Sequence, residues 1–179
     1  MNLQNSGFDK NSTYFEHSLD SSGIPTVFIH GVGLDHTMWL PQKKYFHNKN
    51  IIFYDLLNHG RSKKGYKELK FNNFTDQLNQ LVNFLEIKKF YLIGFSIGAL
   101  IAQHFTSKYY KKINKLILIA SVYKRSEKQI TKVQNRYGMA LEGKSITVDS
   151  INRWFNPEYL KINPDVYSYF YNILERKNV

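Results

Sequence analysis

The residues most able to do chemistry in this sequence lie at positions 94–98, which read Gly-Phe-Ser-Ile-Gly. A short apolar run precedes them, and a helical pattern rich in small side chains follows. This is the context of a G-x-S-x-G nucleophile elbow, in which a strained turn holds the serine hydroxyl out beside a helix. Side chains at Gly94 and Gly98 would clash in so tight a turn. Ser96 is therefore a candidate nucleophile; the alternative is a glycine-rich turn whose serine only caps the helix.

An acyl-transfer site also needs donors for the oxyanion, a general base and a group that orients the base. The N–H of Ile97 is one expected oxyanion donor, because it lies at the positive end of the predicted helix. The N–H of Val32 is the other, because a glycine on each side of this residue lets the N–H turn toward the site. Four further residues are expected to line the site: His30, Gly31, Gly33 and Phe95.

The general base is not evident in the sequence. The only histidine after Ser96 is His104, which lies eight residues along the same predicted helix. At 1.5 Å per residue it is roughly 12 Å away, too far to take the serine proton. His30 and His59 precede the elbow and are interpreted as structural or site-lining; an enzyme that uses either as an unusual base is an alternative that only geometry can support. The remaining histidines are interpreted as surface residues: His17, His36 and His47.

Alternating strands and helices must position these residues. Short apolar runs predict strands at residues 13–19, 24–30, 49–56, 90–95 and 115–120, and helical spacing predicts helices at 36–47, 73–85 and 97–110. Such alternation predicts right-handed crossovers and a three-layer α/β fold, a mainly parallel sheet with helices on both faces. Trp39 and the helix at 73–85 are assigned to the core. Asp55, at a strand end, is expected to anchor the following loop through backbone N–H groups.

The pattern changes near residue 122. Helices are expected at residues 127–141, 148–155 and 165–175, and no further strand follows. We therefore expect a core of residues 1–122 and a helical segment of residues 123–179. No linker, repeat or low-complexity tract separates them.

Composition excludes several classes of function. The 179 residues contain no cysteine, which excludes disulfides, thiolate catalysis and cysteine-based zinc sites. No apolar run is long enough to span a membrane, and the polar first 20 residues contain no signal peptide pattern, so we expect a cytoplasmic protein that binds no membrane. The net charge is +11, but the lysines are scattered in pairs rather than forming a stripe, so nucleic-acid binding is not expected. No metal and no cofactor are expected.

Three motifs, in this order, resemble the α/β-hydrolase superfamily. The first is a strand that ends in His30-Gly31, with Trp39 a short way on. The second is Asp55 followed by Asn-His-Gly-Arg-Ser at residues 58–62, similar to the family's D-x-x-G-H-G-x-S turn with Asn58 in place of the first glycine. The third is the elbow, with Ser96 in the nucleophile position. The resemblance covers about residues 12–122, and the helical segment after them is similar to a cap over the site.

The resemblance implies an activity and a gap. Within the superfamily the sequence is most similar to small cofactor-free enzymes such as enol-lactone hydrolases and carboxylesterases, which implies that a small-molecule ester or lactone is cleaved through an acyl-enzyme on Ser96. The family's acid and histidine follow the nucleophile, beyond the cap. The resemblance therefore implies that the chain stops before both and lacks the last strands of the family's sheet. It also implies that no triad acid or histidine is present and that the chain alone is inactive.

Two consequences of this gap are expected. The strand at 115–120 becomes an exposed sheet edge, which is an aggregation hazard. We therefore expect the isolated chain to be marginally stable, or to cover this edge with a second chain or by self-association. The alternative to a serine hydrolase is a short, non-catalytic relative that binds a small molecule or a partner subunit.

Overall fold

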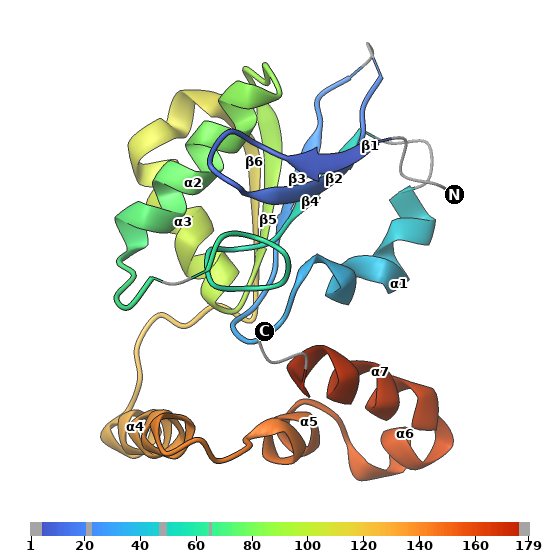
Figure 1. The fold of residues 1–179 in the computed structure, drawn as a ribbon, viewed down its shortest axis with the longest axis vertical. Helices are drawn as coiled ribbons and strands as arrows, with labels where there is room; N and C mark the ends of the chain where they lie inside the picture. The colour runs from blue at the N-terminus through green and yellow to red at the C-terminus, as the bar shows by residue number, and fades with distance from the viewer. Residues whose placement is uncertain (1–4, 21–22, 47–49, 65, 176–179) are drawn as a thin grey trace. The chain divides into compact units, whose positions relative to one another are not determined.

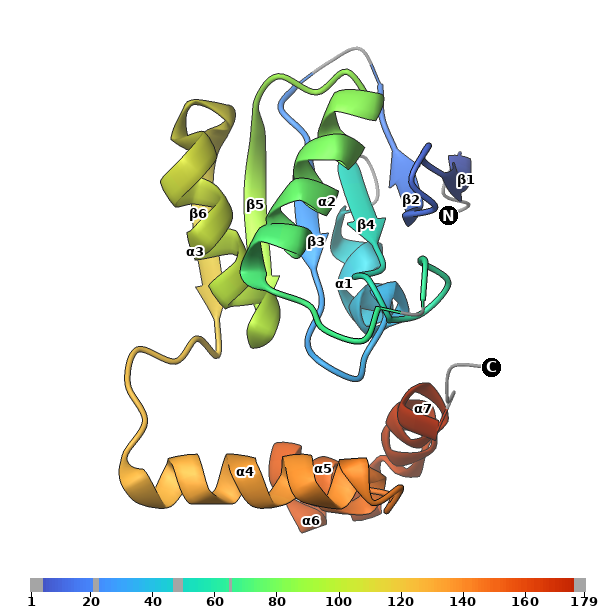
Figure 2. The ribbon, with the colours of Figure 1, turned by 60° about the vertical axis from the view of Figure 1, so that its left-hand side comes forward.

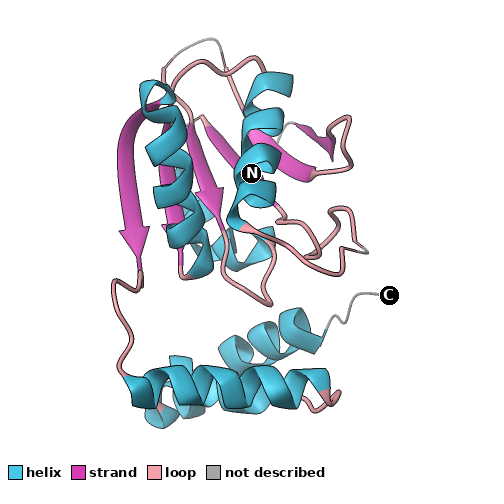
Figure 3. Ribbon diagram, turned by 90° about the vertical axis from the view of Figure 1, so that its left-hand side faces the viewer, coloured by secondary structure: helices cyan, strands magenta, loops and turns pink. Residues whose placement is uncertain are grey.

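The computed structural model describes residues 5–20, 23–46, 50–64 and 66–175. The chain divides into two compact units, Met1–Ser121 and Val122–Lys177. Figure 3 shows that the strands belong to the first unit, whereas the regular structure described in the second unit is helical.

The first unit is built on a six-stranded sheet with the order β1-β2-β4-β3-β5-β6. In that order the strands are β1 (Asn5–Phe8), β2 (Tyr14–Ser18), β4 (Ile51–Tyr54), β3 (Thr26–Ile29), β5 (Phe90–Phe95) and β6 (Ile113–Ile119). β3 pairs in parallel with β4 and β5, and β5 pairs in parallel with β6. β2 pairs antiparallel with β1 and β4. The sheet is therefore mixed, and its parallel part contains the elbow strand β5.

Helical segments cover both faces of this sheet, so the predicted three-layer α/β fold is confirmed (Figures 1 and 2). On one face α2 (Phe71–Phe84) and α3 (Ile97–Tyr109) bury the larger apolar cluster. On the other face lie η1 (His36–Trp39), α1 (Leu40–Lys43) and η2 (Lys44–Phe46), and Trp39 packs there against Phe28. The two clusters share strands because successive side chains of a strand point to opposite faces.

The structure differs from the expected elements in three places. β1 was not predicted, because Asn-Ser-Gly-Phe lacks apolar alternation, and it forms by pairing with β2. The helix expected at residues 36–47 is instead a series of short turns, with Pro41 in the first turn of α1. Strand β6 begins at Ile113, directly after the short 3₁₀ turn η3 (Tyr110–Lys112).

The second unit contains α4 (Glu127–Leu141), α5 (Thr147–Trp154), α6 (Pro157–Ile162) and α7 (Pro164–Glu175). α6 was not predicted; Asn156 caps it and Pro157 starts it. Ile151 of α5 and Ile173 of α7 are buried, and α5 and α6 both pack on α7. None of the described helices combines the length and the apolar character that a membrane span requires.

Candidate functional site

Ser96 occupies a strained turn between β5 and α3. Its backbone angles are φ 56° and ψ −116°, in a region that a residue with a side chain seldom adopts. Neighbouring backbone holds it there: the Ser96 N–H donates to the carbonyl of Ile119, at 2.9 Å. This is the geometry that the G-x-S-x-G pattern predicts, and such strain persists where the surrounding structure enforces it.

The two glycines of the motif make this turn possible. A Cβ on Gly94 would overlap the backbone of Gly98. A Cβ on Gly98 would stand only 2.6 Å from the carbonyl oxygens of Ile29 and His30, at the end of β3. Both positions therefore exclude a side chain, because the atoms that would clash belong to the backbone and cannot rotate away.

The Ser96 hydroxyl is partly exposed and does not cap the helix. Its Oγ accepts no hydrogen bond from the first turn of α3. The alternative of a purely capping serine is therefore not what the structure shows. Within the described residues the hydroxyl has no other side-chain partner, so it is free to meet a ligand.

The loop after β3 lies beside the elbow. β3 and β5 are paired in parallel, with Ile29 opposite Gly94, and a Cβ on Gly31 would stand 2.9 Å from the ring of Phe95. The structure thus brings together the first residues of this loop and the elbow, as the sequence predicts. Val32 is 57% exposed, and Gly33 has φ 73°. That the N–H groups of Val32 and Ile97 hold an oxyanion stays a prediction.

His30 is a buried structural residue. The Leu56 N–H donates to His30 Nε2 at 2.9 Å, so Nδ1 carries the proton and donates to the Gly31 carbonyl at 2.8 Å. Burial lowers the pKa of His30 to about 4, so the ring is neutral at pH 7. Because both ring nitrogens are engaged, His30 cannot serve as the base for Ser96.

His59 and His104 are also held elsewhere. The Nδ1 of His59 lies 2.8 Å from the Leu57 carbonyl, and its ring meets that of His30 edge-on. Burial lowers its pKa. His104 Nδ1 bonds to the Thr75 hydroxyl at 2.7 Å, between α3 and α2. Within the part of the chain that the structure describes, no histidine bonds to Ser96.

Asp55 anchors the loop that follows β4, as predicted. One carboxylate oxygen accepts the Arg61 N–H at 2.8 Å, and Gly60 leaves the space that this approach needs. The Ser62 hydroxyl donates to the Asp55 carbonyl at 2.6 Å and accepts the Tyr14 N–H at 2.9 Å. The loop is thereby fastened to both β4 and β2.

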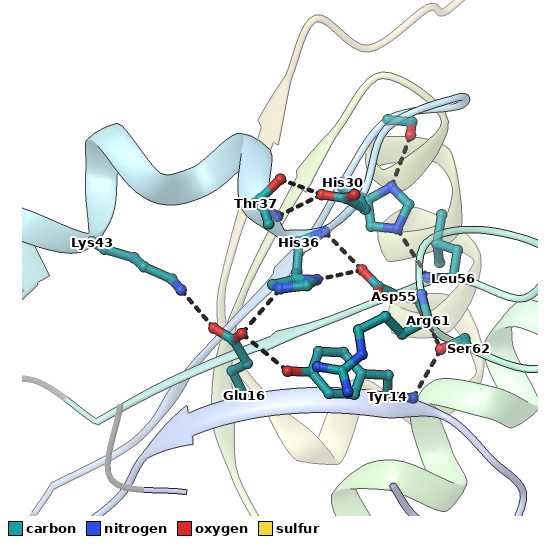
Figure 4. Close-up of polar contacts among 12 residues, drawn as sticks. Tyr14, Glu16, His30, His36, Thr37, Lys43, Asp55, Leu56, Arg61 and Ser62 are labelled. Atoms are coloured by element: carbon teal, nitrogen blue, oxygen red, sulfur yellow. Dashed lines mark hydrogen bonds and ion pairs between the residues drawn. The ribbon is translucent and has the colours of Figure 1, made fainter. Parts of the chain in front are cut away.

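The interpretation of His36 as a surface residue was wrong. His36 is only 6% exposed, and Figure 4 shows its ring between two carboxylates. Nδ1 lies 2.7 Å from Asp55 Oδ1, and Nε2 lies 3.0 Å from Glu16 Oε1. Burial opposes the charged ring, but these hydrogen bonds outweigh it and raise the pKa of His36 to about 9. The sequence signal that was missed is Glu16, a charged residue inside a strand.

His17 and His47 were also interpreted as surface residues. His17 is partly buried on β2, where its ring stacks on Phe15, and burial lowers its pKa, so it is not a free surface residue either. His47 lies outside the described residues.

One group of described residues has atoms close enough to share a metal ion: Asp35, His36 and Asp55. The His36 ring already donates from both nitrogens to carboxylates, so it has no lone pair for a metal. Asp35 caps η1 by accepting the Thr37 N–H at 2.9 Å. The arrangement is a network of ion pairs and hydrogen bonds, and it does not fit a metal.

Comparison with known proteins agrees with this geometry. Residues 25–143 match the family model described as alpha/beta hydrolase fold. A curated relative, the (E)-2-((N-methylformamido)methylene)succinate hydrolase of Acinetobacter baylyi, is 27% identical over 148 residues, which are 82% of this chain and 55% of that protein. The chain thus spans about half the length of this relative.

Two solved structures share the fold. The enol-lactonase from Burkholderia xenovorans LB400 superposes with a TM-score of 0.78 at 18% identity, covering 93% of this chain and 66% of that one. A thermophilic esterase from Thermogutta terrifontis gives a TM-score of 0.79 at 23% identity, covering 92% and 62%. At these identities the likeness establishes the fold alone.

Proposed function

This chain belongs to the α/β-hydrolase fold family, and we propose that Ser96 is the nucleophile of a hydrolase that acts on a small carboxylic ester or lactone. The observation that carries the proposal is the strained backbone of Ser96, with φ 56°, between β5 and α3. Strain of this kind is stored at functional sites. Two of the similar proteins are named for this substrate class, an enol-lactonase and an esterase, and the curated relative is named as a hydrolase of a succinate derivative.

The proposed reaction begins when Ser96 Oγ attacks the carbonyl carbon of the substrate while a base takes the hydroxyl proton. The backbone N–H groups of Val32 and Ile97 hold the negative oxygen of the tetrahedral intermediate. The C–O bond to the alcohol then breaks, and the alcohol leaves with the proton. Water cleaves the acyl-enzyme by the same steps, which releases the acid and restores Ser96.

We propose that the base lies outside the described residues. His30 is engaged through both ring nitrogens, His59 and His104 each bond elsewhere through Nδ1, and His36 donates from both nitrogens. His104 is the only histidine after Ser96 in these 179 residues. A serine without its base loses on the order of 10⁴ to 10⁶ in rate, so we expect these residues alone to be nearly inactive.

The test is an esterase assay with p-nitrophenyl acetate and a simple lactone, together with labelling by a fluorophosphonate probe. The variants are Ser96→Ala and a control, Ser107→Ala, which removes an exposed hydroxyl from the same helix. We expect label and turnover to depend on Ser96 and not on Ser107. Because the rate without a base is expected to lie near background, the deciding comparison is made with added imidazole: equal labelling and equal rates in wild type and Ser96→Ala under that condition would overturn the proposal and favour the non-catalytic alternative.

Added imidazole tests the missing base separately. If Ser96 lacks a base, imidazole supplies one and raises the rate of the wild type more than that of Ser96→Ala, whose rate measures the background reaction of imidazole itself. If Ser96-dependent turnover is already fast and imidazole adds nothing, a base is present, and the second part of the proposal fails.

A further inference from the structure

Two histidines mark the ends of the loop that carries Val32. His30 directly follows β3, and His36 begins η1, so residues 31–35 form the loop between the two histidines. Both histidines bond to the same short segment at the end of β4. His30 accepts the Leu56 N–H, whereas His36 bonds to Asp55. Both ends of the loop are therefore attached to two adjacent residues that directly follow β4.

At the other end of the loop, His36 makes three hydrogen bonds. The Oδ1 of Asp55 accepts both the backbone N–H and the ring Nδ1–H of His36, each at 2.7 Å. The ring's other nitrogen donates to Glu16 at 3.0 Å, on β2. A single side chain thus joins the loop to two strands of the sheet. Hydrogen bonds between ionised groups are about twice as strong as neutral ones.

The carboxylates that hold His36 are themselves held. Glu16 accepts Lys43 Nζ from α1 at 2.6 Å and the Tyr14 hydroxyl at 3.1 Å. The second oxygen of Asp55 accepts the Arg61 N–H at 2.8 Å. Because each carboxylate is oriented by other donors, His36 has little freedom to move, and neither does the backbone that it anchors.

We propose that His36, clamped between Asp55 and Glu16, is a positioning residue that fixes the far end of the 31–35 loop and so aligns the Val32 N–H with Ser96. We call the attachment of the loop through His36, Asp55 and Glu16 the clamp. The expected effect on turnover rests on the proposed function, but the clamp itself does not. His36 touches neither the elbow nor a substrate, and it acts through the loop. Removing its charge loosens residues 31–36 and leaves β5 and α3 in place.

The clamp has a pH range that follows from its neighbours. The groups that face the His36 ring are Glu16 from β2, Asp55 after β4, Tyr14, whose ring lies 5.1 Å away, and Asp35 on the same turn. Two cations are also near: Lys43 donates to Glu16, and the Arg61 guanidinium lies over the Tyr14 ring. The pKa of His36 is about 9, so above this pH the ring keeps one N–H and loses the other. One of its two bonds to a carboxylate is then lost, which weakens the attachment of the loop, while the backbone N–H of His36 still donates to Asp55.

Hydrogen exchange tests the clamp without needing turnover. The protein variants are His36→Gln and Glu16→Gln, with His17→Gln as the matched control, because His17 neighbours Glu16 on β2 and does not bond to the loop. We expect exchange at residues 31–36 to rise about tenfold or more in His36→Gln, and in the wild type above pH 9 after correction for intrinsic rates. Exchange at residues 90–99 should not change.

The two kinds of failure are distinguishable. If residues 31–36 exchange as in the wild type, or if the whole first unit exchanges faster by one common factor, the positioning role is overturned. If His36→Gln does not fold, the exchange at residues 31–36 is measured in Glu16→Gln, which keeps the buried imidazole, and tests the positioning role in its place. Where Ser96-dependent turnover is present, kcat should fall about tenfold in His36→Gln with KM little changed, and the loss of kcat above pH 9 should disappear. Absence of Ser96-dependent turnover in every protein even with added imidazole, with exchange as expected, refutes the proposed function and not the clamp.

Discussion

Gly98 lies directly against the carbonyl of His30, so that a Cβ on residue 98 would stand 2.6 Å from that oxygen. The contact joins the first turn of α3 to the end of β3. It explains why the second glycine of the motif is required: the helix and the strand meet through their backbones, and the meeting point also positions the loop that carries Val32.

The first prediction concerns this contact. Gly98→Ala should lower the unfolding free energy of the first unit by about 3 kcal/mol or more, because a rigid backbone can relieve the overlap only by moving α3 away from β3. Urea unfolding followed by Trp39 fluorescence, in a Trp154→Phe background, measures this. The control is Gly7→Ala on β1, where a Cβ meets nothing within 4 Å. A cost no larger than that of the control would show that α3 shifts freely.

A second prediction separates backbone strain from a clash. Gly60 has φ 50°, and a Cβ there would overlap the carboxylate of Asp55. Gly23 has φ 86°, but its nearest neighbour would be Asn50 Nδ2, at 3.7 Å. Gly23→Ala should therefore cost only the left-handed strain of about 1–2 kcal/mol. Gly60→Ala should cost clearly more, because it also displaces the carboxylate that holds His36 and Arg61.

The same unfolding assay compares the two variants. If Gly60→Ala and Gly23→Ala cost the same, then Asp55 moves aside without loss, and its role as the anchor of the 56–62 loop is wrong. Exchange of the Arg61 amide provides a local check, since its N–H is the donor that Gly60→Ala should release.

Local patterns in the sequence predicted the elbow well, because its requirements are local. Gly94, Ser96 and Gly98 fall within five residues, and their spacing alone indicates the turn that the structure shows. The buried strands and helices were also predictable, since apolar periodicity reports which face of each element is covered. Asn58 in place of a glycine is explained by its φ of 62°, which asparagine tolerates.

The His36 network was not predictable from local patterns. Its partners Glu16 and Asp55 lie about twenty residues away on either side, and only the pairing of β2 with β4 brings them together. Histidine is intermediate in its tendency to be buried, and the polar residues around His36 favoured the wrong interpretation. The strand β1 was missed for a related reason, because it depends on pairing with β2 rather than on its own side chains.

A third prediction is the pH dependence that this network gives to stability. The pKa of His36 is raised to about 9, so its contribution is complete below its unfolded pKa of about 6.5 and is lost as the pH rises through 9. Hydrogen bonding to His36 lowers the pKa of Glu16 to about 2, so its contribution is present above pH 4.5 and is lost as the pH falls toward 2.

The unfolding free energies of the wild type and His36→Gln, measured from pH 3 to pH 10, test both the loss at alkaline pH and the loss at acid pH. Their difference should be largest near neutral pH, up to about 3 kcal/mol, and should shrink at both ends of the range. A difference that stays constant with pH would mean that His36 contributes only by packing.

The last prediction concerns strand β6, which lies at one end of the sheet and pairs only with β5 among the described strands. Three successive apolar residues there, Ile117, Leu118 and Ile119, are each 39–47% exposed. An open strand edge with apolar side chains pairs readily with another chain. We therefore expect these residues, as an isolated chain, to self-associate with increasing concentration. Ile117→Lys should weaken the association about tenfold or more, because burying a charge on the new interface is costly.

Sedimentation velocity over a wide range of concentration measures this association, and salt is kept high so that repulsion between the basic chains does not mask it. The control is Leu40→Lys, which removes a similarly exposed apolar side chain from α1. If both lysine variants weaken association equally, general hydrophobic contact rather than the β6 edge drives it. A wild type that stays monomeric throughout would contradict the prediction and show that the exposed strand is protected by its own geometry.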